Sequence, residues 1–313
     1  MVRICVLAMR SVQVGVTKPL CYRLTDSPTV WNLRPVILLS YNLVKPWGVC
    51  CVADESSQFL VADRDAHAVL VFDRNGSFVT RRTSGFRRPT HLAVTSRGHV
   101  VVTDKDNHRI QVFASSTWTH VRTFGSEGDR DGQFRYPWEV AVNSADQILV
   151  SDSKNYRVQL FTAAGVFVAK HCLERASRDD KDGPRGVAFA PNDFAAVADF
   201  DMLRVLVLSP DLRCVVHVIG VPGLTAGPPR SPVELRSKGC IERPRGLAFD
   251  AAGSLIVVQA RTNRETNSLL KLTASGECLQ VQFDKDACGV CVCADARIAV
   301  VQPQTGVVIY DDI

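Results

Sequence analysis

A run of cysteines near the C-terminal end of the chain has a spacing that could bind a metal. It reads Cys288-x-x-Cys291-x-Cys293, and paired thiols with two residues between them occur in zinc sites. A zinc knuckle needs a second pair, which the sequence does not supply. Cys291 and Cys293 alternate along one apolar run and should face the core together. We therefore expect no metal and interpret these residues as inert, buried thiols.

The other cysteines are also expected to be reduced thiols. The chain has eleven cysteines, an odd number, and several lie inside valine-rich runs. Residues 1–20 are interrupted by Arg3, Arg10 and Lys18 and make a poor signal peptide. We therefore expect reduced thiols in a cytoplasmic protein. No apolar run approaches the ~18 residues of a membrane span, so we expect no membrane partner.

Basic and aromatic residues form a second set that could do chemistry. Arginine and lysine neutralise phosphates, while tryptophan and tyrosine stack on unpaired bases, each stack contributing about 1–3 kcal/mol. The net charge of +5 equals that of residues 1–45 alone, so only the placement of basic residues can favour nucleic acid. The candidate RNA-binding residues are Lys45, Trp47, Arg64, His67, Arg88, Lys105, His108, Tyr136, Trp138, Lys154, Tyr156, Arg185, Arg243 and Arg245.

Internal repeats predict the elements that position these candidates. Six similar units have their third residues at positions 48, 91, 139, 186, 246 and 289. The third unit, for example, reads P-W-E-V-A-V from Pro137, L-V-S-D to Asp152 and N-Y-R-V-Q-L-F to Phe161. Short alternating runs separated by turns are typical of β-strands, and one small sheet cannot bury both of its faces alone. We predict an all-β fold, a six-bladed β-propeller.

The last unit ends after its third strand and needs a fourth. The β-rich segment Val36–Asn42 precedes the first unit and has no other evident partner. We expect this segment to supply the missing outer strand of the sixth blade and to close the ring, which removes an exposed sheet edge. The predicted organisation is an N-terminal extension over residues 1–33 and a propeller over residues 34–313.

Strand direction decides which residues share a face. In a four-stranded blade, the linker that leads into the inner strand and the turn between the second and third strands lie at the same end. The candidates fall in these two segments and should form two concentric rings, with Glu139 and Glu242 as minor acidic members. A residue that recurs in every unit is more typical of a structural contact. This is our interpretation of Asp63, Asp104, Asp152, Asp199, Arg109 and Arg157.

The units resemble a known repeat. The pattern P-x-G-V-A followed by D-x-x-N-x-R-h-Q-h-F, with the linker Phe124–Phe134, resembles NHL repeats, above all those of tripartite-motif proteins of the heterochronic translational-repressor group. The resemblance implies binding of mRNA hairpins, translational repression in the cytoplasm and protein silencing factors as further partners. We expect neither DNA nor a cofactor. The family's RING, B-box and coiled-coil segments have no counterpart, since residues 1–45 hold only Cys5 and Cys21 and no histidine.

Two other functions compete with RNA binding. The same face could dock a protein, as the substrate-recognition part of a ubiquitin-ligase family member, because fold alone does not choose a partner. Some propellers with related repeats are lyases or lactonases with a metal in the channel, which needs several converging histidines or carboxylates. Only His91 begins an inner strand, so we expect no enzyme. The long linker Val221–Arg243 should lie on the same face, either as a surface insertion or beside the ligand.

Overall fold

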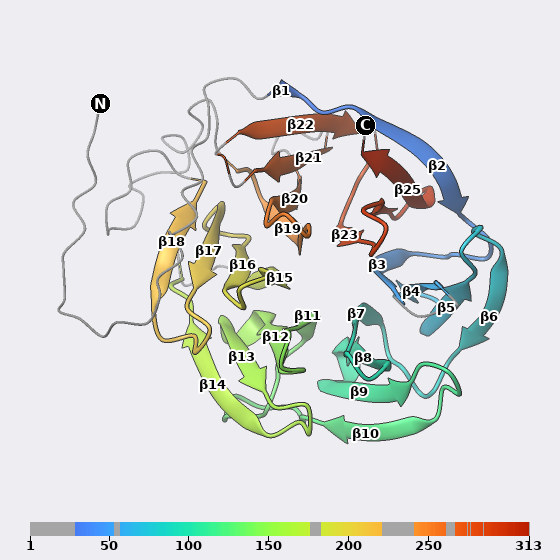
Figure 1. Cartoon of the computed structure of the whole chain (residues 1–313). Coiled ribbons are helices and arrows are strands. Elements are labelled where there is room, and N and C mark those ends of the chain that lie inside the picture. Colours follow the sequence, from blue (N-terminus) through green and yellow to red (C-terminus); the bar gives the residue numbers. More distant parts are fainter. Residues whose placement is uncertain are drawn as a thin grey trace, which may run out of the picture.

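The structure, a computed structural model, describes residues 29–52, 57–175, 183–220, 241–260, 267–273, 275, 277–283 and 285–312. Its strands form six sheets arranged around a central axis, as predicted (Figure 1). Each blade runs from an inner strand near the axis to an outer strand at the rim. The long linker Val221–Arg243 lies largely outside the described residues.

Blades 1 to 3 follow one another along the chain with the strand order inner to outer. Blade 1 consists of β3 (Pro46–Cys51), β4 (Phe59–Asp63), β5 (Ala68–Phe72) and β6 (Phe78–Arg82). Blade 2 consists of β7 (Pro89–Val94), β8 (His99–Asp104), β9 (Arg109–Ala114) and β10 (His120–Phe124), with the short 3-10 helix η1 (Lys105–Asn107). Blade 3 consists of β11 (Pro137–Val142), β12 (Ile148–Asp152), β13 (Arg157–Phe161) and β14 (Phe167–Cys172), with η2 (Ser153–Asn155).

Blades 4 to 6 have the same order, but the last two take strands from the N-terminal part of the chain. Blade 4 consists of β15 (Pro184–Phe189), β16 (Ala195–Asp199), β17 (Arg204–Leu208) and β18 (Val215–Ile219). Blade 5 consists of β19 (Pro244–Phe249), β20 (Leu255–Gln259), β21 (Asn267–Leu272) and β22 (Cys278–Phe283), with β1 (Thr29–Val30) added in parallel. Blade 6 consists of β23 (Gly289–Val292), β24 (Ile298–Gln302), β25 (Gly306–Asp312) and β2 (Leu33–Leu39).

The core lies between blades rather than inside any one of them. Successive side chains of a strand point to opposite faces of its sheet. In β8, Val100 and Val102 therefore pack against blade 1, while Val101 packs against blade 3. Similar apolar clusters join every neighbouring pair of blades, including blade 6 with blade 1. This two-sided burial explains why the second strands read as continuous valine-rich runs.

The ring closes as the sequence predicts. Strand β2 pairs antiparallel with β25, from Leu33 opposite Asp312 to Leu39 opposite Val307. Trp31 Nε1 donates to Asp312 Oδ1 at 2.6 Å, and Arg34 pairs with Asp311 at 2.8 Å. The strand begins three residues earlier than Val36, the first residue of the predicted segment. The parallel pairing of β1 with β22 was not predicted.

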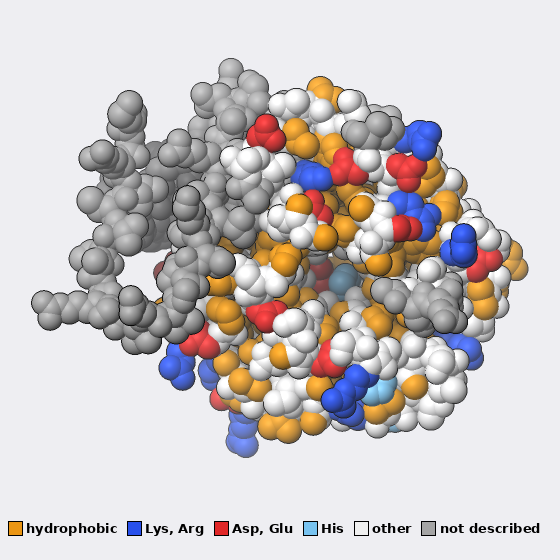
Figure 2. All heavy atoms as spheres, viewed as in Figure 1, with side chains coloured by type: hydrophobic (Ala, Val, Ile, Leu, Met, Phe, Trp, Pro, Cys, Tyr) orange, Lys and Arg blue, Asp and Glu red, His pale blue; other side chains and the backbone are white. Residues whose placement is uncertain are grey.

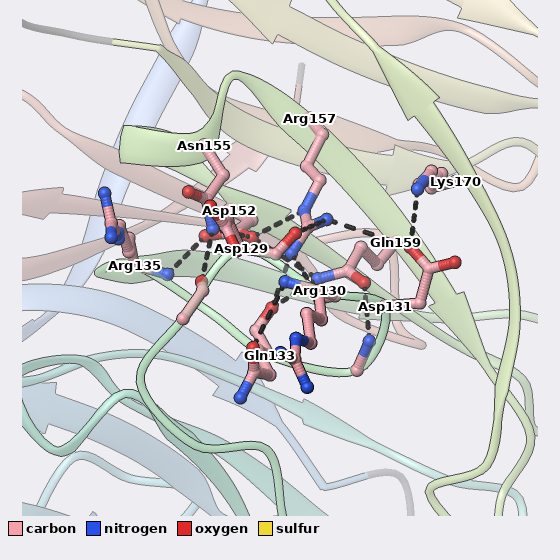
Figure 3. Close-up of polar contacts among 12 residues, drawn as sticks. Asp129, Arg130, Asp131, Gln133, Arg135, Asp152, Asn155, Arg157, Gln159 and Lys170 are labelled. Atoms are coloured by element: carbon pink, nitrogen blue, oxygen red, sulfur yellow. Dashed lines mark hydrogen bonds and ion pairs between the residues drawn. The ribbon is translucent and has the colours of Figure 1, made fainter.

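A buried carboxylate at the end of the second strand holds each of the first four blades to its turn. In blade 3, Asp152 accepts hydrogen bonds from the backbone N–H of Arg135 (2.7 Å), from Asn155 Nδ2 (2.8 Å) and from Arg157 Nε (2.8 Å) (Figure 3). The Arg157 guanidinium also donates to backbone carbonyls of the preceding linker, including that of Gln133. The interpretation of these recurring Asp and Arg residues as structural contacts is therefore confirmed. Burial raises the pKa of Asp152 despite these donors.

Candidate functional site

The linkers into the inner strands and the turns between second and third strands form one face of the ring, which we call the linker face. The opposite face, built by the other turns, we call the turn face. Backbone hydrogen bonds join the two kinds of segment on the linker face. Arg64 N donates to Lys45 O at 3.0 Å, and Lys154 N donates to Arg135 O at 3.1 Å. The predicted candidates therefore lie on a single face, in adjoining rings.

Two tryptophans from different blades meet near the axis of the linker face. The Trp47 and Trp138 rings pack edge to face with their centroids 5.6 Å apart. The Arg64 guanidinium lies 4.7 Å from the Trp47 ring centroid. Lys105 Nζ lies 5.4 Å from the Trp138 ring and 4.8 Å from the Tyr136 ring. Cations at these distances are attracted by the negative faces of the rings.

The alternation of cations and rings continues into blades 4 and 5. The Arg185 guanidinium lies 5.0 Å from the Trp138 ring and 3.6 Å from the Phe200 ring, and Arg243 lies 5.8 Å from Phe200. Phe200 was not predicted, although it occupies the same first turn position as Arg64 and Lys105. We call this set the cation–aromatic ladder; its members are Trp47, Arg64, Lys105, Tyr136, Trp138, Arg185, Phe200 and Arg243.

Two carboxylates order the basic side chains in blades 1 and 2. Asp65 lies 3.0 Å from Arg64, 3.9 Å from Lys45 and 3.7 Å from Arg88. Burial pushes the pKa of Asp65 upward, but the hydrogen bond from Arg64 and the three positive charges outweigh it, so the pKa is lower than usual. Asp65 is therefore ionised at neutral pH.

The second carboxylate, Asp106, forms ion pairs with basic residues of blade 2. Asp106 lies 2.9 Å from Lys105 and 3.6 Å from Arg88. Burial lowers the pKa of Lys105, and Asp106 counteracts that shift. The basic residues of these two blades are therefore partly neutralised by their own neighbours.

Three basic or aromatic residues of the linkers have unusual backbone geometry, which sets the direction of their side chains. Arg88, Tyr136 and Arg243 each precede the proline that starts an inner strand, and each has a positive φ, of 53°, 57° and 38°. Non-glycine residues rarely adopt this conformation, and proline disfavours helical geometry in the residue before it. His67 Nδ1 accepts the backbone N–H of Arg88 at 3.0 Å, and His108 Nδ1 accepts that of Tyr136 at 3.1 Å.

These contacts change the interpretation of several predicted residues. His67 and His108 act as clips between blades, so their Nδ1 atoms are already used. Tyr156 is buried, with the Arg175 guanidinium 4.1 Å from its ring centroid. Arg245 Nη1 pairs with Asp286 at 2.6 Å. Lys154 is exposed on the same face.

The placement of Glu139 among the acidic residues of the inner ring on the linker face was wrong. Its side chain is buried between blades, and its Oε1 lies 3.6 Å from His91 Nε2. Burial raises the pKa of Glu139 well above its usual value, although hydrogen bonds from the backbone N–H groups of Val187 and Leu247 act to lower it. Burial also lowers the pKa of His91 to about 4. Both shifts favour the neutral form of each side chain, and neutral His91 hydrogen-bonds through Nδ1 to the Val140 carbonyl at 3.1 Å.

The prediction that all cysteines are reduced was also wrong. Cys51 and Cys293 form a disulfide between blades 1 and 6. Cys50, Cys172, Cys214, Cys278, Cys288 and Cys291 are free thiols. Across the described part of the chain, no three His, Cys, Asp or Glu side chains are grouped so that they could hold a metal ion.

The turn face has a different surface from the linker face. Figure 2 shows its Lys, Arg, Asp and Glu side chains scattered singly or in small groups around a central hollow. Among the described residues, no helix has the length and apolar character needed to cross a membrane.

Comparisons with known proteins agree with the repeat pattern. The NHL repeat model matches residues 86–113 and 134–161. The chain is 32% identical over 76 residues to NHL-repeat-containing protein 4 of Mus musculus; this covers 24% of the chain and 54% of the relative, or about half its length. The chain therefore contains NHL repeats within a six-bladed propeller.

Solved structures share the fold at low sequence identity. A virginiamycin B lyase from Staphylococcus aureus has a TM-score of 0.60 at 11% identity, covering 90% of this chain and all of that one. A putative gluconolactonase has a TM-score of 0.63 at 15% identity, covering 91% of this chain and 93% of that one. At this identity the likeness establishes the propeller architecture alone.

Proposed function

We propose that the linker face binds structured RNA, and that the protein acts in post-transcriptional repression through stem-loops in mRNA. The observation that carries the proposal is the cation–aromatic ladder, in which inner strands, linkers and turns of five blades bring rings and cations together. The tripartite-motif proteins whose NHL repeats this chain resembles supply the cellular setting: the cytoplasm, with protein silencing factors as further partners.

The ladder offers both kinds of contact that an RNA loop needs. Unpaired bases stack on aromatic rings or on guanidinium planes, and phosphates pair with arginine and lysine. Tyr136 and Arg243 are exposed at the rim of the ladder, whereas Arg64 and Lys105 are held deeper by their carboxylates. We therefore expect Tyr136 and Arg243 to contact RNA first.

Binding to RNA hairpins of varied loop sequence, measured by fluorescence anisotropy over a series of salt concentrations, tests this proposal. We expect affinity to fall as salt rises, because bound phosphates release counterions. Trp138→Ala should weaken binding roughly 10- to 100-fold, as expected for losing about 1–3 kcal/mol of stacking. Arg243→Ala is a milder, exposed substitution that should also weaken binding.

Two exposed arginines on the turn face provide matched controls. Arg74→Ala and Arg97→Ala each remove one positive charge but lie opposite the ladder, so they should leave affinity unchanged. No binding of any hairpin by the wild-type protein would refute RNA recognition. Equal losses in the ladder and control variants would show that binding is only non-specific attraction to charge.

A second candidate function is a protein-interaction surface, and the carboxylates of blades 1 and 2 favour it. Asp65 and Asp106 neutralise part of the basic ring, which suits a partner of mixed charge better than a polyanion. Asp65→Asn distinguishes the two candidates. It should strengthen binding of RNA, since it removes a repelling charge, whereas it should weaken binding of a partner whose arginine or lysine pairs with Asp65.

A further inference from the structure

The disulfide lies at the seam where the ring closes. Cys51 is the last residue of β3 in blade 1, and Cys293 directly follows β23 in blade 6. The two cysteines are 242 residues apart in the sequence. The bond therefore joins the inner strands of blade 1 and blade 6. These two neighbouring blades lie at opposite ends of the sequence, whereas every other pair of neighbouring blades is consecutive along the chain.

A third sulfur contacts this bond. Cys291 and Cys293 are two residues apart on one strand, so their side chains share a face. Cys291 Sγ lies 3.9 Å from Cys51 Sγ, and the Cys291 thiol is free. Cys291 is half-buried, and burial raises its pKa to about 11, so at neutral pH it is mainly a protonated thiol of low reactivity.

The disulfide also borders an open pocket on the turn face. The pocket has a volume of about 90 Å³, and its lining includes Cys51, Cys293, Ser57, Asp295 and Arg297. Arg297 pairs with Asp295 at 2.7 Å, and its guanidinium lies 5.7 Å from the Phe59 ring. Cys291 is absent from this lining. Among the three sulfurs, only those of the disulfide border the pocket.

We propose that Cys51, Cys291 and Cys293 form a thiol–disulfide exchange site that delivers a modifiable Cys293 thiol to this pocket, where a small disulfide bearing carboxylates reacts. The Cys291 thiolate attacks Cys51 Sγ, the bond from Cys51 to Cys293 breaks, and Cys293 leaves as a thiolate. The ring seam stays covalently closed through Cys51 and Cys291. No oxidant is consumed, because one disulfide replaces another.

The second step uses the small disulfide as co-reactant. The Cys293 thiolate attacks one of its sulfurs, forms a mixed disulfide and releases one equivalent of thiolate, which takes up the proton lost by Cys291. The Arg297 guanidinium is placed to attract a carboxylate of the incoming molecule. The first step sets the rate, since little of Cys291 is thiolate at neutral pH.

Incubation of the full chain with oxidised glutathione at pH 8.5, followed by peptide mapping with mass spectrometry, tests the proposal. In the wild-type protein we expect a glutathione adduct on Cys293 together with a Cys51–Cys291 linkage. Cys291→Ala should lose at least nine-tenths of the Cys293 adduct, because nothing displaces Cys293 from its bond. The exposed thiols Cys172 and Cys214 should react equally in both proteins, which checks the reagent and the fold.

Two results would overturn the exchange site. One is an undiminished Cys293 adduct in Cys291→Ala, which would mean that the reagent attacks the existing disulfide directly. The other is a wild-type protein whose Cys293 stays unmodified while Cys172 and Cys214 react. Cys291→Ser is a second variant in case alanine disturbs packing, and it should behave in the same way. Arg297→Ala should slow modification by oxidised glutathione several-fold and leave modification by bis(2-hydroxyethyl) disulfide, which carries no charge, unchanged.

Discussion

Blades 2 and 3 differ from blades 5 and 6 in the residue that ends the second strand. Each must fix the linker that enters its inner strand. Asp104 and Asp152 do so with a buried carboxylate that accepts a linker N–H and is paired with arginine. Gln259 in blade 5 accepts the Glu242 N–H through Oε1 at 3.0 Å and donates to Ser268 Oγ at 2.9 Å. Gln302 occupies the equivalent position in blade 6.

The same contrast appears at the axis. The third residue of the repeat unit is Gly246 in blade 5 and Gly289 in blade 6, where an added Cβ would lie within 3 Å of the neighbouring backbone. In blades 2 and 3 this residue is His91 or Glu139. In blades 2, 3 and 5 a side chain at the end of the second strand accepts the linker N–H, and that acceptor is a carboxylate in blades 2 and 3 but an amide in blade 5. The NHL repeat model matches blades 2 and 3, whereas blades 1 and 4 also have the buried carboxylate, as Asp63 and Asp199.

The largest expected effect on stability comes from removing the buried carboxylate that accepts the linker N–H, which we call a charged cap; the glutamine in the same position of blade 5 is a neutral cap. Asp152→Ala removes the nearer carboxylate partner of Arg157, whose side chain is only 5% exposed and keeps as partners backbone carbonyls and the more distant Asp131, at 3.9 Å. We expect a loss of about 3–5 kcal/mol in the free energy of unfolding. Urea unfolding followed by circular dichroism measures it, with the exposed Asp129→Ala as control. A loss below 1 kcal/mol would show that the carboxylate is dispensable.

The neutral cap should be less costly to remove. Gln259→Ala abolishes two hydrogen bonds but strands no charge, so we expect a loss of about 1–3 kcal/mol in the same assay. If this variant proved as unstable as Asp152→Ala, the distinction between charged and neutral caps would fail.

The axial pair predicts a particular dependence of stability on pH. Between the usual pKa values of glutamate and histidine, near 4.5 and 6.5, the unfolded pair also holds one proton, now on histidine, so the pair makes stability nearly independent of pH there. Above pH 6.5 the unfolded pair loses this proton while folded Glu139 keeps its own. Stability should therefore fall with rising pH, by up to about 1.4 kcal/mol per pH unit.

Glu139→Gln isolates this contribution because glutamine imitates the protonated carboxyl. We expect the decline between pH 6.5 and 8 to be smaller in the variant than in the wild-type protein, measured by urea unfolding at each pH. Parallel pH profiles for the two proteins would mean that Glu139 is ionised in the fold. Glu139, Arg185 and Arg245 all lie close enough to Cys288 to affect its pKa, so Cys288 and the two arginines should be kept unchanged in this comparison.

The smallest expected effect concerns the clips between blades. His108→Ala removes the acceptor of the Tyr136 N–H and should cost about 0.5–1.5 kcal/mol. Because that hydrogen bond steadies a strained residue of the ladder, RNA affinity should drop as well. His99→Ala, on the turn face, is the matched control. An unchanged affinity in His108→Ala would separate the clip from the binding surface.

Sequence reasoning recovered most of the fold because repetition makes the pattern visible. The six units, the recurring Asp residues and the strand that closes the ring all depend on chain direction and period. Sequence reasoning did not predict the contacts between neighbouring blades. The Cys51–Cys293 bond depends on the register between inner strands far apart in the sequence, and Phe200 joins the ladder only because Arg185 lies beside it. Glu139 was misplaced because the sequence does not show which inner-strand side chains turn inward.

The pairing of β2 with β25 also determines how the molecule should respond to mechanical load. Leu33 and Asp312 lie opposite each other at one end of this pair, and the described chain reaches the seam from both directions there (Figure 1). Tension applied at these two points would peel the strands apart one hydrogen bond at a time instead of shearing all of them together. A pulling experiment should therefore open blade 6 at low force, after which the covalent link between blades 1 and 6 would carry the load.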